Sequence, residues 1–312
     1  DKFVRNQESL WIHSEPHWDQ RPIPKVKEFE EAFATYVGSK FAVAVNNATS
    51  GLHLSVLALG LSKGDRVITT PITFAASANC VRYCGGEVVF SDIDPKTYLL
   101  DLDKVKSLLE ASPKGTYKGI ITVDFAGRAV DLESFKKLAD EYGLWIIQDS
   151  CHSPGGFFRD SKNLVQNCGN GNFADLAIFS FHPVKHIATG EGGMITTNDE
   201  NLYNKLLSLR THGIVKNPEQ FKNSIKFSGG LDEYPGWYME MQELGYNYRL
   251  TDIQSALGIS QLKKASSGLQ KRKEIAKIYF NSFDNKSFIK GQSGFIEGHA
   301  YHLYIIEVEN RL

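Results

Sequence analysis

Short runs of apolar and β-branched residues alternate with segments of helical periodicity between about residues 26 and 215. The helical segments carry apolar side chains three or four positions apart, as Phe29 and Phe33 do. The predicted helices lie at 26–37, 49–59, 74–83, 102–109, 131–142 and 200–210. The predicted strands lie at 41–45, 67–70, 88–90, 119–123, 144–147, 176–181 and 194–197. This alternation predicts an α/β fold with a mostly parallel central sheet and helices on both faces.

The pattern changes after residue 250. Residues 251–280 predict one long helix or a bent pair, and 304–309 alternate as a strand does shortly before the sequence stops. We therefore expect a large domain over residues 1–250. Residues 251–312 would be a linking helix and the start of a small C-terminal α/β domain that is truncated.

Charge and cysteine usage exclude several classes of protein. The chain has 35 Lys and Arg against 36 Asp and Glu, with no basic run, which argues against nucleic-acid binding. No apolar run approaches the length of a membrane span. The four cysteines show no disulfide framework, so a cytoplasmic location is expected. Cys151 and His152 lack partners at zinc-ligand spacing, so no metal site is predicted.

The most distinctive local signal surrounds Lys185. A predicted strand at 176–181 leads into a loop with this single lysine, and the Gly-rich turn 189–193 opens the next strand. A partly desolvated lysine in such a loop suits an enzyme that forms Schiff bases, because burial frees the nucleophilic amine. On spacing alone, an ordinary solvated lysine is the commoner case.

A second signal is Asp149, which follows the apolar strand 144–147. Ligands of parallel sheets bind at the carboxyl ends of the strands, and pyridoxal phosphate (PLP) needs a carboxylate against its ring nitrogen. A capping role for Asp149 is about equally favoured by the sequence. The nearby His152 would more commonly be a packed histidine than a functional one.

Two further segments join a strand to a helix. Thr49 and Ser50 could form a phosphate seat at a helix N-terminus, although an ordinary helix cap is commoner. Phe74 could stack on a planar ring, although an aromatic residue there is more often part of a core. The Gly-rich segment 169–174 imitates a dinucleotide fingerprint but precedes a strand, so we reject it.

In this order, the segments resemble the DegT/StrS-type sugar aminotransferases, a branch of the fold-type I PLP enzymes. The resemblance runs from about residue 25 to the end of the chain. Its most specific part is Phe179–Lys185 followed by Gly190–Gly193. The other matching segments are Asn47–His53, Phe90–Pro95, Asp149–Ser153 and Gly245–Gly258.

The resemblance implies a role for each candidate residue and makes residues 1–250 the PLP-binding domain. Lys185 would form the Schiff base with PLP and then shuttle the proton, while Asp149 would pair with the pyridine nitrogen. The other cofactor-binding residues implied are His152 near the ring hydroxyl, Phe74 stacked on the ring, Thr49, Ser50 and Ser180 at the phosphate, and Asn247 from the second subunit of a homodimer. Arg249 is a weaker candidate at the same interface.

The resemblance also implies the reaction. Dehydratase relatives carry His where Lys185 stands, so we expect transamination. Segments 123–128 and 209–213 are most similar to the pseudaminic-acid branch, which aminates C4 of a UDP-linked 4-keto-6-deoxy-N-acetylhexosamine for surface or cell-wall sugars. By analogy the amino donor is glutamate.

Three alternatives stay open at this point. The nearest is another PLP sugar enzyme, either a 3-aminotransferase or a dehydratase. A nicotinamide-dependent sugar oxidoreductase belongs to a different class and lacks a correctly placed glycine fingerprint. A third alternative is a protein with the PLP fold that acts as a regulator or structural partner, against which the intact Lys185 and Asp149 argue.

Overall fold

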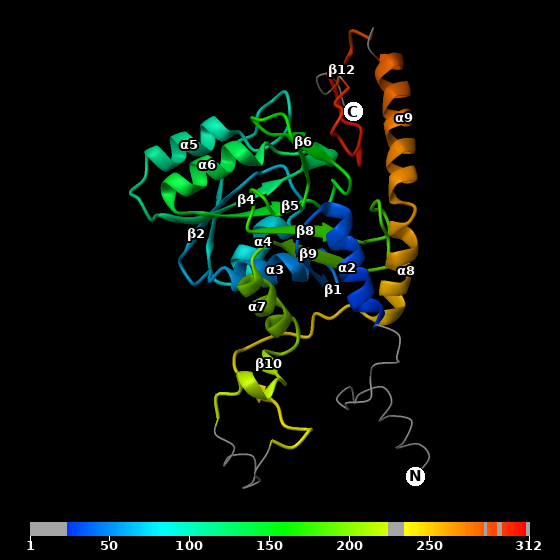
Figure 1. Cartoon of the computed structure of the whole chain (residues 1–312). Helices are drawn as coiled ribbons and strands as arrows, with labels where there is room; N and C mark the ends of the chain where they lie inside the picture. Colours follow the sequence, from blue (N-terminus) through cyan, green and yellow to red (C-terminus); the bar gives the residue numbers. More distant parts are fainter. Residues whose placement is uncertain (1–23, 224–233, 284–285, 292–294, 310–312) are drawn as a thin grey trace.

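A seven-stranded sheet lies at the centre of the protein (Figure 1). The computed structural model describes residues 24–223, 234–283, 286–291 and 295–309. Residues 1–23, which the sequence assigns to the large domain, lie outside this description. The strands are β1 (Phe41–Val45), β2 (Arg66–Thr69), β3 (Glu87–Phe90), β4 (Tyr117–Val123), β5 (Trp145–Asp149), β8 (Leu176–Ser180) and β9 (Gly193–Thr197).

The strand order is β1-β9-β8-β5-β4-β2-β3. Strand β9 pairs antiparallel with both β1 and β8. All other neighbours in this sheet are parallel. The predicted mostly parallel sheet is therefore confirmed, and β9 is the strand of this sheet that runs against the rest.

Helices connect these strands and cover both faces of the sheet. They are α2 (Lys25–Val37), α3 (Ala48–Ala58), α4 (Ala76–Tyr83), α5 (Leu102–Glu110), α6 (Leu132–Tyr142) and α7 (Glu200–Arg210). Asp131, the first residue of the helix predicted at 131–142, is the N-cap of α6, since its side chain accepts a hydrogen bond from Ser134 N. Gly38 ends α2 with a φ of 85°, a left-handed conformation that glycine adopts without strain.

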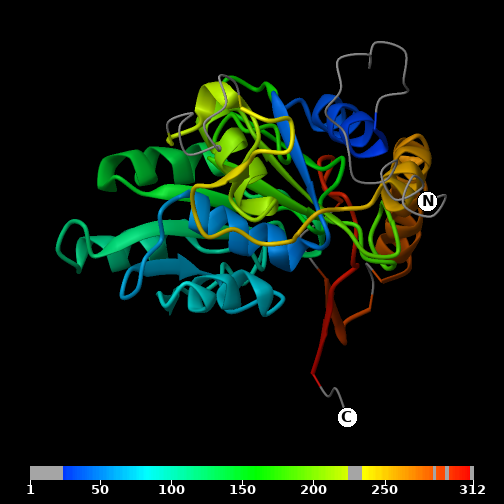
Figure 2. The same ribbon diagram turned by 90° about the horizontal axis from the view of Figure 1, so that it is seen from below.

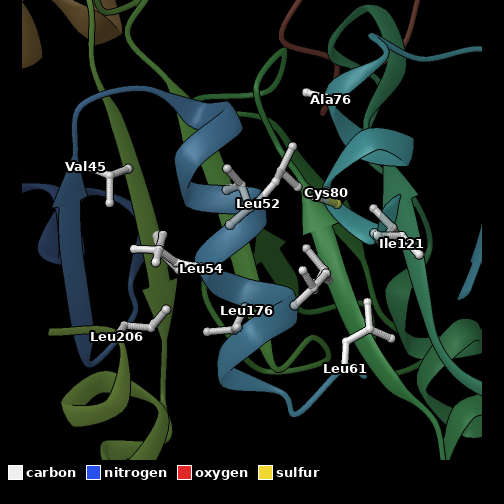
Figure 3. Packing of buried hydrophobic residues seen from close by; sticks show 14 of the residues in the cluster. Val45, Leu52, Leu54, Leu61, Ala76, Cys80, Ile121, Leu176 and Leu206 are labelled. Atoms are coloured by element: carbon white, nitrogen blue, oxygen red, sulfur yellow. The ribbon is translucent and has the colours of Figure 1, made fainter. Parts of the chain in front are cut away.

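Alternate residues of each strand enter different cores. Ile178 of β8 joins the core under α3, α4 and α7, whereas the next residue, Phe179, faces α2. Figure 3 shows the first of these cores, which is drawn with side chains from α3 and its neighbours: Val45, Leu52, Leu54, Leu176 and Leu206. The opposite face carries α5 and α6 near one end and α2 near the other (Figure 1).

The chain after residue 250 forms two consecutive helices, which agrees with the second of the two alternatives predicted, a pair and not one long helix. Helix α8 (Asp252–Leu262) packs along α2, and α9 (Ala265–Phe283) continues from it. Figure 1 shows α8 beside α2 and α9 extending from it towards β12, on the side of the sheet away from α5 and α6. Figure 2 gives the same arrangement seen from below. Strand β13 (Ile306–Val308) confirms the predicted C-terminal strand and pairs with β12 (Ile289–Gly291). The domain boundary at residue 250 stays a prediction.

The remaining elements are short. They are two antiparallel strand pairs, β6 (Phe157–Arg159) with β7 (Val165–Asn167) and β10 (Ile214–Val215) with β11 (Glu240–Met241), and the 3₁₀ turns η2 (Phe125–Gly127) and η3 (Pro218–Gln220). Within the described residues, no helix combines the length and the apolar character needed to cross a membrane.

Strands β2, β4, β5 and β8 run in one direction, so their carboxyl ends meet at the same edge of the sheet. Strand β1 has this direction too, because both β1 and β8 are antiparallel to β9. The loops that follow these strands therefore come together at one edge, where open α/β sheets bind their ligands.

Candidate active site

A cavity of about 740 Å³ lies at this edge of the sheet. The loops after β1, β2, β5 and β8 and the first turn of α3 contribute its walls. Seven of the eight predicted site residues line it: Thr49, Ser50, Phe74, Asp149, His152, Ser180 and Lys185. The topology thus gathers segments that are more than 130 positions apart in the sequence.

Asn247 lies apart from these seven residues. It is exposed, forms a β-bridge with Thr211, and does not line the cavity of its own chain. Its neighbour Tyr248 does line that cavity. The predicted reach of Asn247 into the site of a second subunit stays a prediction, and Arg249 is likewise exposed.

Lys185 is half-buried in the loop after β8, where its backbone N–H donates to the carbonyl of His182 at 2.9 Å. Burial lowers the pKa of the Lys185 amine, and the negative charge of Asp149 opposes this shift. The net lowering increases the share of neutral amine, which is the nucleophilic form. Lys185 is half-buried and lines the cavity, which differs from the solvated surface lysine that spacing alone favoured.

Asp149 is the last residue of β5 and is 5% exposed. Its Oδ1 accepts a hydrogen bond from Cys151 N at 3.1 Å, a turn-forming contact of the kind that the capping alternative expected. Its Oδ2 accepts from the Ser77 hydroxyl at 2.7 Å. Asp149 also lines the cavity, so it both shapes the loop and borders the space that a ligand would occupy.

The first turn of α3 has the backbone donors that an anion seat requires. Asn47 is the helix cap, because its Oδ1 accepts from Ser50 N at 2.8 Å, so the capping role weighed for Thr49 and Ser50 belongs to Asn47. The first hydrogen bond within the helix runs from Gly51 N to Asn47 O. The N–H groups of Ala48 and Thr49 come before this bond, so they have no acceptor within the helix. These donors and the helix dipole favour a phosphate beside the hydroxyls of Thr49 and Ser50.

Phe74 is exposed to solvent, whereas His152 packs against other histidines. Phe74 is 75% exposed, so it is not the core residue that its position alone would favour. His152 stacks on His302 with ring centroids 4.3 Å apart, and His186 lies 5.5 Å from His302. Burial lowers the pKa of His152 to about 3, and the charge of Lys185 adds to this effect.

The profile of the DegT/DnrJ/EryC1/StrS aminotransferase family matches residues 6–312. The chain belongs to this family. The family and the aminotransferase class predicted from the sequence are therefore confirmed.

Two relatives of the chain carry the names of nucleotide-sugar enzymes. The chain is 40% identical over 264 residues to the UDP-4-amino-4,6-dideoxy-N-acetyl-beta-L-altrosamine transaminase of Campylobacter jejuni, covering 85% of this chain and 63% of the relative. It is 37% identical over 279 residues to the GDP-perosamine synthase of Caulobacter vibrioides, covering 89% and 65%. The chain thus spans slightly less than two thirds of either relative.

A solved structure shows the same fold. Helicobacter pylori PseC, described as an aminotransferase involved in the biosynthesis of pseudoaminic acid, superposes with a TM-score of 0.77 at 33% identity. The match covers 94% of this chain and 71% of that one. The predicted fold class, that of the fold-type I aminotransferases, is confirmed.

The side chains around the cavity of this family member fit PLP. They provide an amine, a buried carboxylate, an anion seat and an exposed aromatic face. Nδ1 of His152 is buried without a hydrogen-bond partner, so it could accept one from or donate one to a bound polar group. Among the described residues, no group of three or more His, Cys, Asp or Glu side chains is arranged to hold a metal ion.

The structure adds residues that the sequence did not single out. Ser77, which donates to Asp149, is buried and carries no motif. Asp124, which accepts hydrogen bonds from the loop after β5, is also buried and lies in the segment 123–128 that the family resemblance had marked. Tyr248 lies in a segment that the family resemblance had already marked. His302 lies in the C-terminal region, where the sequence showed only a strand pattern.

Proposed function

We propose that the protein is a PLP-dependent aminotransferase that moves an amino group from glutamate to a nucleotide-linked keto-sugar. The observation that carries this proposal is the meeting of Lys185, Asp149 and the N-terminus of α3 in one cavity. We further propose that the acceptor is the C4 keto group of a UDP-linked 4-keto-6-deoxy-N-acetylhexosamine. The named activity of the Campylobacter relative and the pathway of PseC support this choice.

PLP, when bound, supplies an aldehyde that takes up an amino group and a ring that withdraws electrons from the neighbouring carbon. Lys185 Nζ would bind the cofactor between turnovers. During each half-reaction the freed Nζ would take the proton from one carbon and return it to another, acting as base and then as acid. Its lowered pKa makes the neutral form needed for the first of these steps accessible.

Asp149 would hold a proton on the ring nitrogen, because an ionised carboxylate in a site screened from water stabilises a positive partner. Thr49, Ser50 and Ser180 would bind the phosphate, and Phe74 would orient the ring by stacking. His152 would contact the ring hydroxyl through its unpartnered Nδ1.

A homodimer completes this assignment. Asn247 is exposed and lies outside its own cavity, so in our proposal it binds the phosphate in the partner's site. Residues 1–250 would then form the PLP-binding domain, and residues 251–312 the start of a second domain.

An absorption experiment tests the function directly. The purified protein should show a visible band of bound PLP, and glutamate should convert this band to that of the aminated cofactor. A band that glutamate and other amino acids leave unchanged would contradict transamination. Absence of any band after PLP is supplied would contradict the PLP assignment itself.

Product analysis then tests the substrate. UDP- and GDP-linked 4-keto-sugars should be compared, because the named relatives include one of each nucleotide. A 3-keto-sugar is offered as well, since amination at C3 requires a carbonyl group at that carbon. Amination at C4 of the UDP-linked sugar is expected. Amination at C3, or release of water without net amination, would instead identify a 3-aminotransferase or a dehydratase.

A further inference from the structure

We propose that Ser77 is a positioning residue for Asp149 and that Thr73 in turn orients Ser77. This inference rests on the proposed function, because it concerns how the chain would hold the ring nitrogen of PLP. Ser77 is fully buried and does not line the cavity, so it can act on a ligand only through another residue. Its hydroxyl donates to Asp149 Oδ2 at 2.7 Å, a contact between residues 72 positions apart.

The two hydroxyls are ordered in one direction. Thr73 Oγ1 and Ser77 Oγ are 2.8 Å apart, and either could be the donor in an isolated pair. An ionised Asp149 can only accept, so the single hydroxyl hydrogen of Ser77 goes to the carboxylate. Thr73 must then donate to Ser77. Each hydroxyl polarises the next, which strengthens the bond that reaches Asp149.

This arrangement fixes both oxygens of Asp149. Oδ2 accepts from Ser77 and Oδ1 accepts from Cys151 N, so the carboxylate is held from two sides. Each carboxylate oxygen has a second lone-pair direction, and Asp149 still lines the cavity. A donor in the cavity, such as a protonated ring nitrogen, would therefore meet a carboxylate whose rotation is already restricted.

The same turn also carries the aromatic residue of the site. Ser77 N donates to Phe74 O at 3.2 Å, so the start of α4 connects Phe74 and Ser77 directly. Phe74 lines the cavity while Ser77, three residues later, points to Asp149. The segment 74–77 would thereby position two groups together: Phe74, which stacks on the PLP ring, and Asp149, which pairs with the ring nitrogen.

The test compares PLP bound to the full chain and to Ser77→Ala. Two quantities are measured: the dissociation constant of PLP, from titration of the cofactor-free protein, and the ¹⁵N NMR shift of PLP labelled at its ring nitrogen. We expect Ser77→Ala to weaken PLP binding roughly tenfold, as loss of a hydrogen bond to a charged group does. The ¹⁵N signal should also move towards that of an unprotonated ring.

Two further variants separate positioning from packing. Ser55→Ala is the matched control, because Ser55 is also fully buried and its hydroxyl donates to Gly51 O at 2.7 Å, away from Asp149. It should leave both readouts unchanged. Ser77→Thr keeps the hydroxyl and should restore the wild-type ¹⁵N shift. A folded Ser77→Ala protein with wild-type affinity and ¹⁵N shift would overturn the inference.

If Ser77→Ala does not fold, Thr73→Val decides the question. It removes the outer donor only, so a smaller ¹⁵N shift in the same direction supports the inference and an unchanged shift overturns it. The wild-type titration keeps this test apart from the proposed function. If the wild-type protein binds no PLP, the proposed function is wrong. If the wild-type protein binds PLP and Ser77→Ala changes neither the dissociation constant nor the ¹⁵N shift, only the role of Ser77 is wrong.

Discussion

His152 and His302 stack with their ring centroids 4.3 Å apart, which connects the loop after β5 to the segment that precedes β13. That segment is held in place by Ala300 N, which donates to Gly127 O at 2.7 Å. Gly127 has a φ of 101°, and a Cβ there would lie 2.9 Å from His152 O. The close approach requires glycine, and it brings the C-terminal part of the described chain against the candidate active site.

The histidines around this stack should make the protein sensitive to acid. Burial lowers the pKa of His152 and His186 to about 3 and that of His302 to about 4. The unfolded chain binds these protons near pH 6.5, so stability is fully present above that pH and is lost as the pH falls towards 3. Each histidine contributes up to about 1.4 kcal/mol per pH unit, and the contribution of His302 ends sooner because its pKa is the highest of the three. Urea unfolding at a series of pH values measures this slope.

His302→Phe tests the assignment of that slope. Phenylalanine keeps an aromatic ring for the stack with His152 but cannot bind a proton, so stability should fall less steeply below about pH 6. The comparison at mildly alkaline pH, where the histidine is neutral, measures any difference in packing alone. An identical slope in both proteins would show that His302 takes up no proton on acid unfolding.

Asp124 should be critical for the loop that carries the site. Its Oδ2 accepts from Gln148 Nε2, Ser150 Oγ and Ser153 Oγ at 2.8, 3.0 and 2.6 Å. Burial raises the pKa of this fully buried carboxyl, and the hydrogen bonds oppose that shift. Asp124→Asn would place an amide donor in a site built for an acceptor. We expect a loss of about 2–4 kcal/mol in the free energy of unfolding, measured by urea denaturation.

The control for this change is Asp131→Asn. Asp131 caps α6 on the exposed surface, and asparagine caps a helix about as well as aspartate does. Its free energy of unfolding should stay within about 0.5 kcal/mol of the wild-type value. If both substitutions change the free energy of unfolding equally, the hydrogen bonds of Asp124 contribute no more to stability than the helix cap of Asp131.

The sequence predicted the helices and strands that have strong periodicity. It also predicted the position of residues that directly follow a buried parallel strand. Asp149 follows a run of buried residues, so its place at the edge of a parallel sheet could be inferred before the fold was known. The two-residue and three-residue strands β6, β7, β10 and β11 were not predicted, because so few residues show no period. Helix α4 begins at Ala76, two residues later than expected, which leaves Phe74 in the loop and exposed.

The contacts around the site were harder to predict than its main residues. Ser77 meets Asp149, and His302 meets His152, only because the sheet brings distant segments together. Neither Ser77 nor His302 belongs to a motif with a local mechanism. The chemistry of Lys185 was ambiguous from the sequence, since the burial that lowers its pKa arises only in the folded chain.

Lys185→Ala should abolish transamination, because Lys185 is the only lysine among the described residues that lines the cavity. The proposed role needs an amine there to bind the cofactor and carry the proton. Product formation from glutamate and the keto-sugar measures this loss, and a small primary amine added to the solution should restore a part of it. Lys63→Ala serves as the control, since Lys63 lies on an exposed turn. Near-normal turnover by Lys185→Ala would remove this residue from the mechanism.

Asn247→Ala should weaken PLP binding in the dimer, although Asn247 does not line the cavity of its own chain. The decisive measurement mixes protomers that carry Asn247→Ala with protomers that carry Lys185→Ala, after each variant alone has been shown to be inactive or nearly so. In a mixed dimer, one site would combine an intact Lys185 with an intact Asn247 from the partner, so part of the activity should return. A site complete within one chain would behave differently, because both variant residues would then reduce activity in separate protomers and mixing could restore nothing. Recovery that depends on the ratio of the two proteins would therefore establish that the sites are shared.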